Sequence, residues 1–261
     1  MDNVLLEIRD LHRQFGGLHA VKNVSLKVSP GSIKAVIGPN GAGKTTLFNL
    51  IAGTITPNQG QVIFKGRQIT ALKPHAIAGL GIARTFQTTR LFPRMTVLEN
   101  VIMGRHIRTR SGFFAAMMNL PRTWHEDRET EARSMLILKE LGLEEFAFET
   151  ASNLSFRRQR LVEFARALGI EPVLLLLDEP AAGLNIYETK ALAKLIQKIR
   201  DKGITCLIVE HDMSLVMNIS DDVIVLDQGQ KIAEGPPHTI QRNPDVLRIY
   251  LGYDYAENPE S

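Results

Sequence analysis

A glycine-rich segment that ends in lysine and threonine has the residue types and spacing of a phosphate-binding loop. It comprises Gly38, Pro39, Asn40, Gly41, Ala42, Gly43, Lys44, Thr45 and Thr46. Glycines let the backbone curl so that successive N–H groups point into one concavity, and a following helix adds partial positive charge. Lys44 is expected to neutralise the β- and γ-phosphates, and Thr45 to offer its hydroxyl to Mg²⁺. The segment predicts a nucleotide site.

Two adjacent carboxylates follow an apolar run. Residues 173–177 are Val-Leu-Leu-Leu-Leu, and Asp178 and Glu179 come next. Open α/β sheets place ligands at the carboxyl ends of such strands, where neighbouring side chains diverge. One carboxylate can then hold the metal while the other activates the attacking water, which suits Asp178 as metal ligand and Glu179 as general base. The alternative is that both residues merely end a core strand.

A histidine ends another apolar run. His211 follows Ile208, Val209 and Glu210, and it closes a strand that should flank the same sheet edge. We therefore expect His211 to contact the γ-phosphate. The alternative is a hydrogen-bonded histidine in the core.

The elements that must position these residues follow from hydrophobic patterning. A strand at 33–37 runs into the glycine-rich loop and then into a helix at 44–52, as phosphate binding requires. Helical patterns at 96–104, 127–141 and 156–168 replace strand patterns between about 88 and 170. Further elements are expected as strands at 4–9, 24–28, 173–177, 204–209 and 222–226, and as a helix at 187–201. Strands that alternate with helices predict a parallel α/β sheet.

Composition excludes several classes of protein. The chain has 261 residues, 44% hydrophobic and 23% charged, which is typical of a folded soluble protein. The net charge of +3 is too small to indicate nucleic acid as a partner, and the single cysteine, Cys206, allows no internal disulfide and fits a reducing compartment. Apolar runs are much shorter than the ~20 residues of a membrane span, and the N-terminus lacks a secretory pattern. Any membrane role is therefore expected to depend on a partner.

With the glycine-rich loop, the Asp-Glu-Pro strand and the late histidine in this order, nearly the whole chain resembles the ATP-binding subunits of ABC transporters. The resemblance implies an α/β P-loop NTPase fold with a parallel core sheet, an N-terminal antiparallel β subdomain and an inserted helical subdomain. It implies one ATP-binding domain over 1–261. Residues 1–87 and 171–235 would form the RecA-like core with the β subdomain, 88–170 the helical subdomain and 236–261 a C-terminal tail.

The resemblance also implies site residues and cofactors. ATP and Mg²⁺ would be bound, with Phe15 stacked on the adenine and Gln87, in Arg-Thr-Phe-Gln, coupling Mg²⁺ to the helical subdomain. For Phe15 the alternative is a core aromatic. Asn185 stands where the family's D-loop meets the partner subunit, often with aspartate.

Within the family, the chain looks most like the branched-chain amino-acid importers, on the segment from Arg84 to Asn100, on Asp-Glu-Pro-Ala-Ala-Gly and on Ala-Glu-Gly-Pro-Pro near the tail. Such importers use an ATPase dimer, of identical or related subunits, on the cytoplasmic face of the membrane. Transmembrane permease subunits form the path, and a solute-binding protein serves them indirectly. Leu91, Phe92 and Met95 would then contact the permease, or else pack inside the helical subdomain. A soluble nucleotide clamp and a hydrolysis-impaired regulatory subunit are the alternative functions.

The family signature, Leu-Ser-Gly-Gly-Gln, is altered in this chain. Here the segment reads Leu154, Ser155, Phe156, Arg157, Arg158. Ser155 would cap a helix whose start is aimed at the nucleotide of the opposite subunit. Arg157 stands where glycine is expected, and Arg158 where glutamine is usual. The arginines would either obstruct the close approach that glycine allows or act as additional γ-phosphate ligands.

Overall fold

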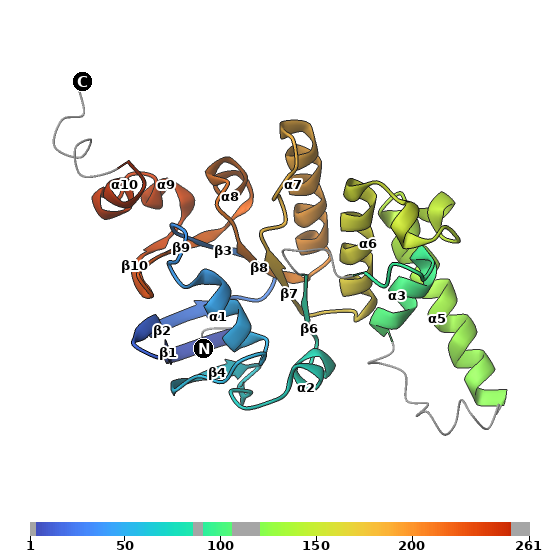
Figure 1. The fold of residues 1–261 in the computed structure, drawn as a ribbon, viewed down its shortest axis with the longest axis horizontal. Coiled ribbons are helices and arrows are strands. Elements are labelled where there is room, and N and C mark those ends of the chain that lie inside the picture. The colour runs from blue at the N-terminus through green and yellow to red at the C-terminus, as the bar shows by residue number, and fades with distance from the viewer. Residues whose placement is uncertain (1–3, 86–90, 106–120, 252–261) are drawn as a thin grey trace. The chain divides into compact units, whose positions relative to one another are not determined.

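The computed structural model describes residues 4–85, 91–105 and 121–251. The chain divides into two compact units (Figure 1). The first comprises Met1–Ile77 and Leu174–Ser261, and the second comprises Ala78–Val173. Each unit is described by itself below.

An antiparallel sheet forms the N-terminal part of the first unit. Its strands are β1 (Leu6–Phe15), β2 (Leu18–Val28), β4 (Gln59–Phe64) and β5 (Arg67–Gln68), in the order β2-β1-β4-β5. The strands β1 and β2 are longer than the predicted 4–9 and 24–28. Register shifts in β1 interrupt the alternation of apolar and polar residues beyond Ile8, so the pattern marked only part of each strand.

A mostly parallel sheet carries the loops of interest. Within the first unit its strands run in the order β10-β9-β3-β8-β7. Four of these strands, β3, β7, β8 and β9, are parallel. Ile37 of β3 lies beside Val225 of β9, and Asp178 of β7 lies beside Val209 of β8. Their carboxyl ends therefore meet at one edge. The bounds are β3 (Ile33–Ile37), β7 (Leu174–Asp178), β8 (Thr205–Val209), β9 (Asp222–Asp227) and β10 (Gln230–Gly235).

Helices cover this sheet. Figure 1 shows α1 on one side of it and α7 and α8 together on the other, and α1 also packs against β2 of the first sheet. Asn185 caps α7, because its side chain accepts the Glu188 N–H at 3.0 Å while Glu188 accepts the Asn185 N–H at 3.1 Å. No helix in the described ranges has the length and apolar character of a membrane span. The bounds are α1 (Lys44–Ile51), α2 (Pro74–Gly79), α7 (Ile186–Asp201), α8 (Met213–Ile219), α9 (Pro237–Ile240) and α10 (Pro244–Leu251).

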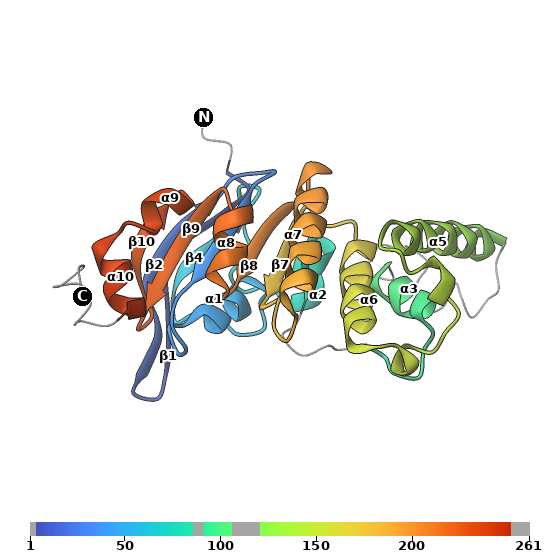
Figure 2. The same ribbon diagram turned by 90° about the horizontal axis from the view of Figure 1, so that it is seen from above.

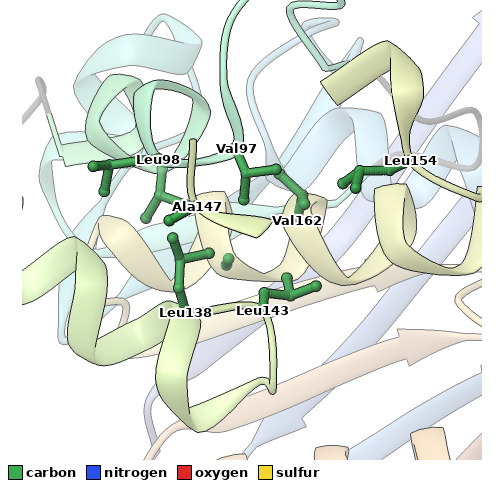
Figure 3. Packing of buried hydrophobic residues seen from close by; sticks show 9 residues of the cluster. Val97, Leu98, Leu138, Leu143, Ala147, Leu154 and Val162 are labelled. Atoms are coloured by element: carbon green, nitrogen blue, oxygen red, sulfur yellow. The ribbon is translucent and has the colours of Figure 1, made fainter. Parts of the chain in front are cut away.

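The second unit is mainly helical. It contains β6 (Ile82–Arg84), α3 (Val97–Arg105), α5 (Pro121–Glu140), α6 (Phe156–Gly169) and the short 3₁₀ turns Glu144–Phe146 and Ala151–Asn153. Its core joins α3, α5, α6 and the turns between them through Val97, Leu98, Leu138, Leu143, Ala147, Leu154 and Val162 (Figure 3). Leu91 packs against this cluster, whereas Phe92 remains 44% exposed. Leu91 and Phe92, two of the three residues considered for permease contact, therefore differ in their environment.

Candidate nucleotide-binding site

The glycine-rich loop connects β3 to α1 as predicted, and two of its glycines are required by close packing. A Cβ on Gly38 would lie 2.0 Å from the backbone oxygen of Leu226, and one on Gly43 would lie 2.2 Å from that of Ala20. Both residues also have positive φ, at 148° and 99°. Because Gly43 is the N-cap of α1 and makes no side-chain cap, the first N–H groups of the helix remain available for an anion.

Lys44 is held inside the loop. Its ammonium donates to the backbone oxygens of Gly38 at 2.6 Å and Pro39 at 2.9 Å, and only 6% of the residue is exposed. Burial lowers the pKa of Lys44, while the carboxylates of Glu179 and Asp178 act against that shift. The charges of Lys44, Asp178 and Glu179 therefore influence one another at the glycine-rich loop. A bound phosphate would replace the two carbonyls as the hydrogen-bond partner of Lys44.

A pocket of about 700 Å³ opens over this loop. Its lining includes residues 40–46, Phe15 and Glu179, so the structure brings most of the predicted nucleotide-binding residues to one place. Phe15 ends β1 and is 43% exposed, which contradicts its alternative role as a core aromatic. The guanidinium of Arg13 lies 4.5 Å from the centre of the Phe15 ring. His19, Lys22 and Gln228 also line the pocket; sequence reasoning did not single them out.

Asp178 and Glu179 occupy the end of β7. Asp178 is the last residue of the strand and is 3% exposed, whereas Glu179 is half-buried and lines the pocket. Glu179 has a φ of +46°, an unfavourable conformation for a residue with a side chain. Its N–H donates to Val209 at 2.9 Å, which fixes the backbone there. The two carboxylates thus differ in burial, and their separate roles as metal ligand and general base stay predictions.

Oxygen donors for a divalent cation are present at this edge. The hydroxyl of Thr45 and the carboxylate of Asp178 are the kinds of ligand that Mg²⁺ prefers. Thr45 follows Lys44 in the sequence, and the charge of Asp178 acts on the pKa of Lys44. No group of three or more His, Cys, Asp or Glu side chains suited to a metal occurs among the described residues. Gln87, the third predicted ligand, lies outside the described residues.

His211 follows β8 at the same edge as Glu179. Its side chain is 59% exposed and its Nδ1 lies 3.9 Å from Glu210, so it is not a buried core histidine. The predicted contact of His211 with the γ-phosphate stays a prediction.

Glu210 is a structural residue that sequence reasoning missed. It is fully buried, and one carboxylate oxygen accepts the Ala181 N–H at 2.7 Å while the other accepts the His211 N–H at 3.0 Å. Burial raises the pKa of Glu210, while these backbone hydrogen bonds and one from Asp212 oppose the rise. Glu210 thereby ties the segment after Glu179 to the segment that carries His211. Its only signal in the sequence was a charge directly after a buried strand.

We expect Glu210→Gln to lower the free energy of unfolding by about 2 kcal/mol, because an amide NH₂ cannot accept hydrogen bonds and would leave a buried N–H unpaired. Urea denaturation of the full chain would measure the loss. Glu145→Gln, at an exposed position in the second unit, is the matched control. Equal stability of the two variants would contradict the bridging role.

The altered signature segment lies in the second unit, where Ser155 is the N-cap of α6. Its side chain makes no capping hydrogen bond, and no acidic residue occupies the first turn. The guanidinium of Arg158 stacks on the ring of Phe146, with 3.9 Å between the guanidinium carbon and the ring centre. Arg157 is exposed. The two arginines are therefore not equivalent: Arg158 is engaged within its own unit.

Comparisons with known proteins agree with this geometry. The family profile described as ABC transporter matches residues 21–182, and that described as branched-chain amino acid ATP-binding cassette transporter matches residues 230–256. The chain is 44% identical to the high-affinity branched-chain amino acid transport ATP-binding protein LivG of Escherichia coli K12, covering 97% of this chain and 99% of that protein.

Solved structures give the same result. The crystal structure of the ADP conformation of an ATP-binding cassette of an ABC transporter superposes with a TM-score of 0.83 at 32% identity, covering 95% of this chain and 99% of the other. A dimeric bacterial ABC transporter cassette gives 0.76 at 26% identity, with 89% and 99% covered. These matches confirm the predicted fold class.

Proposed function

Since the chain belongs to the ABC transporter family, as one of its ATP-binding cassettes, we propose that it powers the import of branched-chain amino acids through a separate membrane permease. The observation that carries the proposal is a pocket lined by the glycine-rich loop, Lys44 and Glu179, with Asp178 next in sequence to Glu179. The relatives named above supply the transported class.

In the proposed reaction, the N–H groups of the loop and the start of α1 bind the phosphates, and Lys44 leaves its carbonyl partners to neutralise the β- and γ-phosphates. Phe15 offers an exposed ring to the base. Thr45, Asp178 and Gln87 would hold Mg²⁺, which supplies positive charge against the phosphate oxygens. Glu179 accepts a proton from the attacking water, and His211 contacts the γ-phosphate.

The proposed assembly places this chain at the cytoplasmic face of the membrane. Two ATPase subunits, identical or related, would pair the loop of one with Ser155 and the signature segment of the other. Residues 88–170 would act as the helical subdomain that moves the permease, residues 1–87 and 171–235 as the core, and 236–261 as a tail. The dimeric cassette among the similar structures supports pairing. The match of residues 230–256 to the branched-chain amino acid ATP-binding cassette transporter family supports the importer subfamily for the tail.

Purification of the tagged chain from native membranes tests this proposal. We expect permease subunits to co-purify with the chain and the resulting complex to hydrolyse ATP. Vesicles that contain the complex should take up leucine, isoleucine or valine. Salt-sensitive binding to nucleic acid without a permease would instead favour the soluble clamp. A complex that binds ATP without turnover would favour the regulatory subunit.

A further inference from the structure

The pocket over the glycine-rich loop joins two parts of the first unit that differ in chemistry. Residues 40–46 supply backbone N–H groups and the ammonium of Lys44, which suit phosphates, whereas the end of β1 and the start of β2 supply the rings of Phe15 and His19. A nucleotide base has flat, apolar faces that stack on aromatic side chains. The end of β1 is therefore where the pocket offers a base its stacking partner.

Arg13 covers one face of the Phe15 ring. Its guanidinium carbon lies 4.5 Å from the ring centre, and the two residues share one side of β1 because side chains alternate along a strand. The Nε of Arg13 is buried and has no hydrogen-bond partner among the described residues, so part of the guanidinium is removed from water. Removal from water strengthens a cation–π contact. A base that stacks on Phe15 would use the face that Arg13 leaves open.

The segment that precedes β4 holds Arg13 in this position. Pairing of β1 with β4 does not extend to the last three residues of β1, and Figure 2 shows β1 and β2 running together to the turn that joins them. Beyond the pairing, Nη1 of Arg13 donates to the backbone oxygen of Thr56 at 2.8 Å. The Gln14 N–H donates to Oδ1 of Asn58, also at 2.8 Å. Hydrogen bonds that involve side chains thus replace the strand ladder where Phe15 is presented.

This segment is also the continuation of α1, the helix that begins in the glycine-rich loop. After the helix ends, the Thr54 N–H donates to the backbone oxygen of Asn49 at 2.9 Å, which fixes the direction in which the chain leaves it. On the other side, the backbone oxygen of Ala20 in β2 fills the place that a Cβ on Gly43 would need. The strand end that carries Phe15 and the loop that suits phosphates are therefore held to each other through α1 and through β2.

We infer that Arg13 is a positioning residue for the nucleotide base: it covers one face of Phe15 and holds the ring so that the base stacks on the other. The inference rests on the proposed function and adds a residue that this function does not include. Arg13 is absent from the described lining of the pocket, so it acts on the base through Phe15 and not by contact with the nucleotide.

Arg13→Gln in the full chain tests this, with ADP and inorganic tripolyphosphate as the probes. We expect the dissociation constant for ADP, measured by calorimetry, to rise by about 3- to 10-fold, the effect of a partly desolvated cation–π contact. The affinity for tripolyphosphate, which has no base, should stay unchanged, and Arg13→Lys should restore part of the ADP affinity because it keeps a cation near the ring. Arg67→Gln, at an exposed arginine of the same sheet, is the matched control and should change neither affinity.

Phe15→Ala provides the second comparison, because it removes the ring through which Arg13 would act. Alone it should weaken ADP binding by about 5- to 100-fold, the range of one base–aromatic stack, and leave tripolyphosphate binding unchanged. Addition of Arg13→Gln to Phe15→Ala should have no further effect, which is the signature of two residues that act as a unit.

Three results would overturn the inference. They are unchanged ADP affinity in either single variant, equal weakening of ADP and tripolyphosphate binding by Arg13→Gln, and an Arg13→Gln effect that persists in full when Phe15 is replaced. A wild-type chain that binds neither ADP nor tripolyphosphate would instead count against the proposed function, so the two failures are distinguishable.

Discussion

Glu179→Gln is expected to lower ATP hydrolysis by the assembled transporter by about 10²- to 10⁴-fold, the range that a positioned general base contributes. Glutamine keeps the size of the side chain and its place in the pocket, but its amide cannot take a proton from water. Phosphate release under saturating ATP would measure the loss, and ATP binding should remain within a few-fold of wild type because the loop and Lys44 are untouched.

The structure explains why this one position should matter so much. Glu179 lines the pocket and has a strained backbone at φ +46°, which its hydrogen bond to Val209 holds in place. Such strain persists only where the surroundings determine it. Its neighbour Asp178 is buried at the strand end and cannot simply substitute for it.

Glu188→Gln is the matched control, since Glu188 lies in the first turn of α7, shortly after Glu179, and a glutamine retains the capping box of that helix. It should hydrolyse ATP at nearly the wild-type rate. If Glu179→Gln kept half of the activity or more, another group would be the proton acceptor, and His211 would be the next candidate to replace.

Local patterns sufficed for the elements that carry the phosphate chemistry. The strand at 33–37 and the helix from Lys44 are found where predicted, because this buried parallel strand is apolar except for Lys34 and the glycines end it sharply. The helices predicted at 96–104 and 156–168 correspond to Val97–Arg105 and Phe156–Gly169. In these segments the local pattern of apolar, polar and glycine residues is enough to predict the helix or strand.

The strand β10 was not predicted, because most of its residues are exposed and it lacks a clear apolar face. The strand β4 was not predicted either, because its buried side chains are confined to Val62 and Phe64 at its end. The contribution of Glu210 could not be predicted for a different reason. Its carboxylate accepts a hydrogen bond from the backbone N–H of Ala181, which is remote in the sequence. A backbone donor has no signature of its own in the sequence, so only the fold reveals the pairing.

The signature segment shows how the structure narrows an open question. Two arginines replace uncharged residues, and the sequence left obstruction and additional phosphate binding as competing interpretations. Arg158 stacks on Phe146, which itself packs against the core of the second unit. Such a stacked guanidinium is held by its own unit. A substitution at Arg157 is therefore the one that distinguishes obstruction from additional phosphate binding.

We expect Arg157→Gly to raise the ATPase rate of the assembled transporter by about 10-fold, equivalent to roughly 1.4 kcal/mol of barrier. Arg157 is exposed in the first turn of α6, whose N-terminus has neither an acidic residue nor a side-chain cap. In the proposed dimer a long side chain there would keep the helix start away from the phosphate of the opposite subunit, and glycine would allow the approach.

Arg158→Gln is the control for Arg157→Gly. Removal of a guanidinium stacked on Phe146 should change the rate much less than Arg157→Gly, although both variants remove one positive charge from the same turn. A simple electrostatic effect would act alike at both positions, whereas steric obstruction would act at Arg157 alone. A large fall in rate with Arg157→Gly would mean that Arg157 binds the γ-phosphate as an arginine finger, and an unchanged rate would exclude both roles.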